Sequence, residues 1–229
     1  MTIPQQIHQT WKNEQVPEHL EAYVQSWRDH HPGWHYTLWT DDMNRDFIAT
    51  HYPSFLPVYD RYPSAIQKVD AVRYFILFQY GGIFVDLDFE CLRHTGSLLK
   101  DAAFVAGKEP AEHALSHQKE YIISNAFMAA ASGAPFLQNI CDTLQQNNYY
   151  RYANEPGFNV ILDCAGPFML SRAYEQYHNK EEVRILEHDV LYPLVKEDTT
   201  GRLRPGDAHN PALLQNAYAI HHYWGSWWH

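Results

Sequence analysis

The chain has 229 residues, 45% of them apolar and 19% charged, so it has the composition of an ordinary globular protein and the length for one substantial core. Its formal net charge is −10, with 27 acidic against 17 basic residues, which argues against a surface that tracks nucleic-acid phosphates. We therefore expect no nucleic acid among its partners.

Cysteine usage and the lack of long apolar runs bear on the compartment. Cys91, Cys141 and Cys164 show no metal-type spacing, and their odd number is typical of reduced thiols in a cytosolic protein. Residues 1–13 lack the apolar stretch of a signal peptide, and no apolar run approaches the ~20 residues of a membrane span. We expect a cytoplasmic protein without an integral membrane span, for which any membrane contact would be peripheral.

Strand and helix patterns alternate along the chain. Residues 3–11 and 35–39 have the pattern of strands, and apolar residues at helical spacing predict a helix within 17–31. Further along, the patterns predict strands at 103–106, 121–130 and 183–194 and helices at 135–147 and 166–177. No repeat, linker or break in composition divides the chain, so we expect a single domain over residues 1–229. Its fold class would be α/β and Rossmann-like, with a mostly parallel central sheet flanked by helices.

A predicted helix over residues 64–80 carries two charges in an unusual setting. The segment is apolar nearly all round, which is typical of a helix buried in the middle of a domain. Asp70 and Arg73 nevertheless lie three positions apart on one side of it. Buried charges must be paired or must contact a polar ligand, because burying a lone charge is costly. A structural ion pair is the simpler interpretation, and contact with a ligand is the functional one.

Two aspartates follow the glycine pair that ends this helix. The stretch GGIFVDLDF (81–89) predicts a strand on which Asp86 and Asp88 share a face, ~6.5–7 Å apart. Carboxylates that close repel each other in a dry environment unless a cation or a base holds them ionised. Mg²⁺ and Mn²⁺ take oxygen ligands and bind substrate phosphates, so this strand end suits a metal–diphosphate complex. The alternative is that both side chains line a solvated edge strand.

Four segments together resemble a known family. DAVRYFILFQYGGIFVDLDFECL (70–92) looks like the signature of the DXD-containing sugar transferases of glycosyltransferase family 32. IPQQIHQTWK (3–12), AGPFMLSRA (165–173) and HHYWGSW (221–227) are similar to the family's opening strand, its Gly-Pro segment and its C-terminal motif. The family includes initiating mannosyltransferases and bacterial capsular polysaccharide transferases, and it is related to the clostridial glucosylating toxins.

The resemblance implies a GT-A fold and a retaining, metal-dependent glycosyltransferase. Such an enzyme moves a hexose from a UDP- or GDP-linked nucleotide-sugar donor to a glycan or lipid-linked acceptor. Mn²⁺ or Mg²⁺ would be the cofactor, because a divalent ion neutralises charge on the departing diphosphate. Eukaryotic relatives carry a membrane anchor that this sequence does not show. We therefore expect a bacterial enzyme of polysaccharide or capsule biosynthesis, at the inner face of the membrane.

The resemblance also implies roles for individual residues. Asp88 would bind the metal directly, and Asp86 would reach the metal shell, the ribose or the donor sugar. Asp70 and Arg73 would hold hydroxyls of the transferred sugar, and Asn125 would orient its reacting face. The further donor-binding candidates are Gln9 and Thr10, Trp11 beside the nucleobase, Phe84 where many relatives have tyrosine, and Ser226 and Trp227.

The C-terminal motif offers a further metal ligand. His222, in His-Tyr-Trp-Gly (222–225), is similar to the histidine that completes the metal site in some other retaining GT-A transferases. Neutral imidazole is a normal ligand for Mn²⁺. His221 is the competing candidate, because neighbouring residues of an extended tail face opposite sides. In the structural alternative, both histidines are exposed.

Two other functions remain open on these residues alone. A nucleotide-sugar hydrolase would use the same site with water as the acceptor. A carbohydrate-binding module would stack sugars on aromatic side chains, which make up 15% of the chain, and would bind glycans without metal. Such a stacking surface would not need the Asp70–Arg73 pair.

Overall fold

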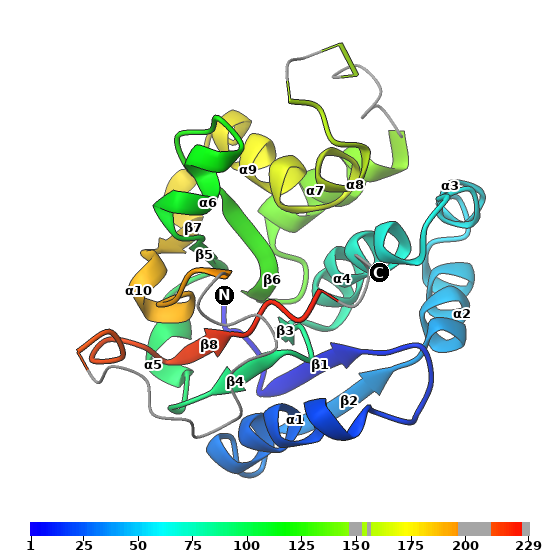
Figure 1. Ribbon diagram of the computed structural model, residues 1–229. Helices are drawn as coiled ribbons and strands as arrows, with labels where there is room; N and C mark the ends of the chain where they lie inside the picture. Colours follow the sequence, from blue (N-terminus) through cyan, green and yellow to red (C-terminus); the bar gives the residue numbers. More distant parts are fainter. Residues whose placement is uncertain (147–152, 155–156, 197–211, 226–229) are drawn as a thin grey trace.

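The structure is a computed structural model that describes residues 1–146, 153–154, 157–196 and 212–225. A six-stranded sheet with the order β2-β1-β3-β6-β5-β7 runs through its middle (Figure 1). Its strands are β1 (Gln6–Thr10), β2 (His35–Trp39), β3 (Gly82–Val85), β5 (Phe104–Lys108), β6 (Ile123–Ala130) and β7 (Val183–Leu186). Neighbouring strands are parallel except at β6, which runs antiparallel to both β3 and β5. The predicted α/β class with a mostly parallel sheet is confirmed.

Helices cover both faces of this sheet (Figure 1). Those in the described ranges are α1 (Glu18–His30), α2 (Asp41–His51), α3 (Leu56–Asp60), α4 (Ala65–Tyr80), α5 (Gly96–Leu99), α6 (Ala111–Ser116), α7 (Pro135–Gln146), α8 (Val160–Cys164), α9 (Pro167–Gln176), α10 (His188–Leu191) and the 3-10 helix η2 (Lys180–Glu182). None of these helices combines the length and the apolar character that crossing a membrane requires. The single domain over residues 1–229 stays a prediction.

Alternate residues of the central strands supply two hydrophobic cores. In β3, Phe84 belongs to the core that also contains the apolar residues of α4, α7 and α9. Ile83 and Val85 belong to the opposite core, together with Trp27 of α1 and Leu191 of α10. This is the period of two expected of a strand that is buried on both faces.

Helix α4 lies in the core, as its all-round apolar sequence predicts. It ends at Gly81, whose φ of 68° lies in the left-handed region. A Cβ on Gly81 would lie 2.7 Å from Pro4 Cδ and from Ser132 N, and one on Gly82 would lie 2.7 Å from Gln6 O. Only glycine fits this turn from helix to strand, so the glycine pair determines where β3 begins.

The predicted strand through both aspartates is wrong. Strand β3 stops at Val85, and residues 86–88 form a turn in which Phe89 N–H donates to Asp86 O at 3.2 Å. After the turn the chain enters β4 (Phe89–Cys91), which pairs antiparallel with β8 (Ala219–His221) in a separate two-stranded sheet. The acidic side chains therefore do not alternate along one strand face. They belong to a turn that faces the C-terminal tail.

The segment 183–194 is only partly a strand. Strand β7 pairs with β5 as far as Leu186, after which Tyr192 N–H donates back to His188 O at 2.7 Å and closes helix α10. Leu191 and Tyr192 are fully buried in the core on that side of the sheet. The apolar pattern here therefore reflects burial of a helix as well as of a strand.

Candidate active site

The turn at residues 86–88 lies at the carboxyl end of β3, next to the parallel strand β1. Its backbone is held on both sides: Asp86 N–H donates to Ala126 O at 2.9 Å, and Asp86 O accepts from Gln9 Nε2 at 3.2 Å. Leu87 is buried in a cluster with apolar residues of α1. Because Leu87 anchors the middle of the turn, the carboxylates before and after it are free to face the same space.

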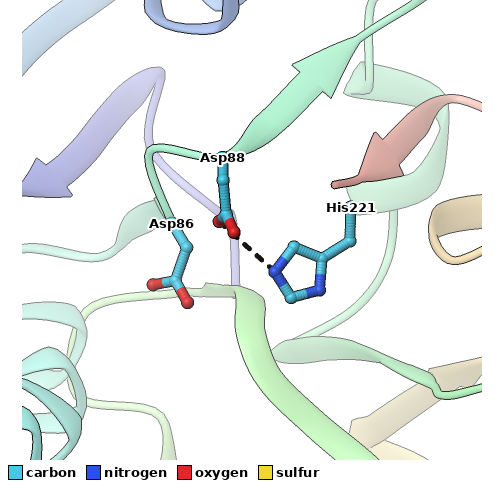
Figure 2. A group of neighbouring side chains, drawn as sticks. All are labelled: Asp86, Asp88 and His221. Atoms are coloured by element: carbon cyan, nitrogen blue, oxygen red, sulfur yellow. Dashed lines mark ion pairs between the residues drawn. The ribbon is translucent and has the colours of Figure 1, made fainter. Parts of the chain in front are cut away.

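Asp86, Asp88 and His221 point toward one another across that space (Figure 2). Each offers one ligand atom, and these atoms all lie within 4.8 Å of one another. His221 Nε2 is 3.3 Å from Asp88 Oδ1. The side chains of Asp86, Asp88 and His221 are 29%, 15% and 12% exposed, so the cluster is partly shielded but open to a ligand.

This donor set fits a divalent cation. Two carboxylates from one turn and one imidazole from β8 converge, which is the mixture of oxygen and nitrogen ligands that Mn²⁺ accepts, while Mg²⁺ favours the oxygens. His221 Nδ1 is buried and has no hydrogen-bond partner within the described residues, so Nε2 is the nitrogen that faces the carboxylates. The three side chains therefore form a candidate site for one ion.

The charges of the cluster depend on one another. Burial raises the pKa of Asp86 to about 6 despite the opposing charge of Arg73, and the negative charge of Asp88 adds to the rise. Burial also acts to raise the pKa of Asp88, but the pair with His221 and the N–H of Trp224 outweigh it and hold that pKa below its usual range. Burial acts to lower the pKa of His221, and the charge of Asp88 outweighs it and raises that pKa. A divalent ion would supply the positive charge that the imidazole proton supplies without it.

A buried network from α4 supports this cluster. Arg73 Nη2 lies 3.1 Å from Asp70 Oδ1 and 3.1 Å from Asp86 Oδ1, and Arg73 Nη1 donates to Asn125 O at 2.6 Å. Asn125 Nδ2 in turn donates to Asp70 Oδ1 at 2.9 Å. Asp70, Arg73 and Asn125 are 6%, 1% and 5% exposed. The pair expected from the sequence is thus an ion pair, and Arg73 extends it to the aspartate turn.

The end of β1 holds the turn from the other side. Gln9 is fully buried, and besides donating to Asp86 O it accepts from Tyr36 OH at 2.9 Å. Thr10 Oγ1 donates to Trp39 O, and both atoms stay below the surface. Trp11, by contrast, is half-buried and packs with the cluster that contains Leu87. Gln9 and Thr10 are therefore buried at the edge of the sheet, whereas the ring of Trp11 is partly accessible.

Phe84 does not line the site. It is fully buried, and the guanidinium carbon of Arg73 lies 5.0 Å from its ring centroid. The expectation that its ring contacts the nucleotide is therefore corrected, because Phe84 lies in the core and supports Arg73 instead. Ser226 and Trp227 lie outside the described residues. The donor-binding roles of the other candidates stay predictions.

The two tail histidines occupy different environments. His221 lies opposite Phe89 in the β4–β8 pair, and the two rings stack with centroids 4.6 Å apart. His222 is fully buried, with Nε2 3.0 Å from Glu90 Oε2 and its ring stacked on Tyr23 at 4.5 Å. The sequence favoured His222 as the metal ligand, whereas the geometry places His221 beside the aspartates. The order of the two candidates is reversed.

Sequence reasoning missed how Asp88 holds the tail. His222 N–H donates to Asp88 O at 2.9 Å, and Trp224 N–H donates to Asp88 Oδ2 at 2.9 Å. It also missed Glu90, the partner of His222. These contacts join residues more than 130 positions apart, and no local pattern signals them. The only hint was the alternation of Asp86, Asp88 and Glu90 along the chain.

Comparisons with known proteins identify the family. A family model described as the glycosyltransferase sugar-binding region containing DXD motif matches residues 17–105. Inositol phosphoceramide mannosyltransferase 2 of Schizosaccharomyces pombe is 38% identical over 196 residues, which cover 86% of this chain and 53% of that protein. An uncharacterized glycosyltransferase, L373, of Acanthamoeba polyphaga mimivirus is 35% identical over 98% of this chain and 84% of its own length. The chain spans about half the length of the inositol phosphoceramide mannosyltransferases it matches.

The fold is shared with solved glycosyltransferases. The PaToxG glycosyltransferase superimposes with a TM-score of 0.57 over 76% of this chain and 69% of that one, at 18% sequence identity. The sheet and the acidic turn at the carboxyl end of β3 therefore define a GT-A type glycosyltransferase fold with a DXD site. The chain belongs to the DXD-containing glycosyltransferases of family 32.

Proposed function

We propose that the protein is a retaining, metal-dependent glycosyltransferase that moves a hexose, with mannose the first candidate, from a nucleotide-diphospho-sugar. The observation that carries the proposal is the convergence of Asp86, Asp88 and His221 within 4.8 Å, next to the Arg73 network. Mannose is favoured because relatives at 37–38% identity are named as mannosyltransferases.

The acceptor proposed is a hydroxyl group of an inositol-containing phospholipid or a glycan. The names of the fungal relatives support the lipid, since inositol phosphoceramide is the acceptor those names state. A bacterial polysaccharide acceptor, expected from the sequence, stays a prediction. So does a position at the inner face of a membrane.

Asp86, Asp88 and His221 would hold the ion, with Mn²⁺ or Mg²⁺ as the candidates. When bound, such an ion supplies positive charge for the departing nucleoside diphosphate. Use of a divalent metal is general in the DXD family, and the donor set described above agrees with it. Trp11 would contact the nucleobase, and its partial exposure beside the buried Leu87 supports this role.

The buried network would orient the donor rather than attack it. Both Asp70 and Asp86 form ion pairs with Arg73, and Asp70 also accepts a hydrogen bond from Asn125, so neither carboxylate is free to act as a nucleophile. Retention is then supported by attack of the acceptor hydroxyl on the face that the diphosphate leaves, with a diphosphate oxygen taking the proton. Asn125 would orient the reacting face of the donor sugar by holding Asp70 in position.

The proposal is tested by binding and then by transfer. A thermal-shift screen of GDP-mannose, UDP-glucose and UDP-galactose, each with and without Mn²⁺, should show one donor that raises the melting temperature only with metal, because ligands that bind the folded state stabilise it. That donor should then transfer its sugar to an inositol phospholipid or a mannoside. Absence of any metal-dependent donor binding would overturn the proposal. Free sugar released without acceptor would instead indicate the hydrolase.

A further inference from the structure

His222 and Glu90 form a buried pair beside the metal-site candidates but outside their cluster. His222 is fully buried, and the Glu90 side chain is 10% exposed. Nε2 of His222 lies 3.0 Å from Oε2 of Glu90. Removing two ionisable groups from water is costly, so a pair kept at this position calls for a reason.

The register of β8 on β4 determines which tail histidine faces Asp88. Phe89 lies opposite His221, and Glu90 lies opposite Ile220. Because side chains alternate between faces, Phe89 and His221 share one face, while Glu90, Ile220 and His222 share the other. A shift of the tail by one residue would exchange the faces and turn His221 away from Asp88.

Backbone hydrogen bonds between β4 and β8 are too few to fix this register by themselves. Strands β4 and β8 have three residues each, and a two-stranded pair of that length is marginally stable by itself. Directly after His222, Tyr223 has a φ of 49°, which is unfavourable for a residue that is not glycine and must be held by its surroundings. Side-chain contacts must therefore fix the tail.

His222 holds the tail by one backbone contact and two side-chain contacts. Its N–H donates to Asp88 O, its ring stacks on Tyr23 of α1, and its Nε2 meets Glu90 of β4. Trp224 reinforces the same arrangement, since its Nε1 donates to Tyr23 OH at 3.4 Å. Helix α1 and strand β4 thus both hold the tail in place.

We propose that His222 is a positioning residue: its pair with Glu90 fixes the C-terminal tail in the register that brings His221 to Asp88, and so sets the metal affinity of the site without contacting the metal. The part concerning metal rests on the proposed function, whereas the part concerning register does not.

The register is tested first, in the metal-free protein, by amide hydrogen exchange at His222 and Trp224. In Glu90→Leu these two amides should exchange at least ~10-fold faster relative to the rest of the sheet, because the tail loses the Glu90 contact that helps to fix the short β4–β8 pair. Glu90→Gln keeps an acceptor for the imidazole and should restore protection. Leu137→Ala, a substitution that creates a cavity in α7, is the matched control for general destabilisation. In this variant the exchange rates of the two amides relative to the rest of the sheet should be as in wild type.

Metal affinity is then measured directly, by electron paramagnetic resonance titration with Mn²⁺ alone. Glu90→Leu should raise the Mn²⁺ dissociation constant by ~10–100-fold, the usual effect of losing an outer partner of a metal site. Glu90→Gln should lie near wild type, and so should Leu137→Ala. If Glu90→Leu does not fold, the double variant Glu90→Leu/His222→Phe removes both polar groups without leaving a buried charge, and the same results are expected of it.

Unchanged exchange at His222 and Trp224 in the folded variant would overturn the inference. The inference would also be overturned if Glu90→Gln lost as much Mn²⁺ affinity as Glu90→Leu. A wild-type protein that binds no Mn²⁺ would contradict the proposed function instead, and the exchange experiment would still decide the role of His222.

Discussion

Nη2 of Arg73 lies 3.1 Å from Oδ1 of Asp86, so a buried ion pair joins the central helix α4 to the aspartate turn. Arg73 holds Asp70 at the same distance from the same nitrogen. One guanidinium therefore balances a carboxylate of its own helix and a carboxylate of the metal-site candidates, and this arrangement supports the first prediction.

Arg73→Met should destabilise the fold as well as the site. The free energy of unfolding should fall by ~3–5 kcal/mol, because the buried Asp70 and the partly exposed Asp86 would both lose their charged partner. Urea denaturation measures this change. The matched control is Arg45→Met, which breaks the exposed Arg45–Asp60 pair and should cost much less, because solvent screens the charges of an exposed pair. Equal losses in the two variants would contradict the role given to Arg73.

Asp88→Asn should abolish sugar transfer. The substitution removes a carboxylate oxygen that would bind the metal and the negative charge that pairs with His221, so activity should fall by more than the ~10–100-fold that loss of an outer partner costs. Steady-state turnover with the donor found in the screen, at several Mn²⁺ concentrations, is the measurement. Asp60→Asn on the surface serves as the control. Turnover near the wild-type level would remove Asp88 from the metal site.

His221 and His222 should differ in how they affect metal. His221→Gln should raise the Mn²⁺ concentration needed for half-maximal activity and should change the exchange of the tail amides less than His222→Gln does, because the contacts of His222 with Tyr23 and Glu90 remain. His222→Gln should raise both, because the tail itself moves. A larger metal defect in His222→Gln with unchanged amide exchange would restore the assignment that the sequence first favoured.

Asp70→Ala should separate sugar binding from nucleotide binding. Asp70 pairs with Arg73 and Asn125 and does not belong to the cluster of Asp86, Asp88 and His221, so its loss should weaken binding of the nucleotide sugar and leave the bare nucleoside diphosphate nearly unaffected. Isothermal titration with both ligands in the presence of Mn²⁺ gives the comparison. Equal weakening for both would place Asp70 in general support of the fold.

Acid should destabilise the protein through a buried neutral histidine. His31 donates from Nδ1 to Trp27 O at 3.0 Å, and its Nε2 accepts from Thr95 N–H at 3.1 Å and lies 2.8 Å from Thr95 Oγ1, so the buried neutral ring has partners at both nitrogens. Burial lowers the pKa of His31 to about 4, below the ordinary 6.5 of an unfolded chain. The unfolded state thus binds the proton first, and stability present above pH ~6.5 is lost as the pH falls toward ~4.

Urea unfolding at pH 7, 5.5 and 4.5 measures this slope. His31→Gln should flatten it, whereas substitution of the exposed His35 by glutamine should not. An identical slope in wild type and His31→Gln would show that other groups govern the acid transition. His8 is one such group, since burial also lowers its pKa to about 4.

Local patterns determined much of this protein. The all-round apolar helix predicted at 64–80 is α4, and the glycine pair ends it where a Cβ would collide with neighbouring backbone. The spacing of Asp86 and Asp88 pointed to metal and diphosphate, and the four matching segments pointed to the family that the comparisons show. These features lie in short stretches, because helix periodicity, turn chemistry and paired charges depend on neighbours in the chain.

Tertiary structure alone decided which groups meet. The aspartates lie in a turn and not along a strand, because Asp86 N–H pairs with Ala126 of β6 and Phe89 N–H bonds back to Asp86 O. Likewise, the choice between His221 and His222 follows from the register of β8 on β4, set across more than 130 residues. Sequence patterns show that alternate residues of an extended tail face opposite sides, but which side faces Asp88 depends on packing against α1 and Glu90, and no local signal contains that information.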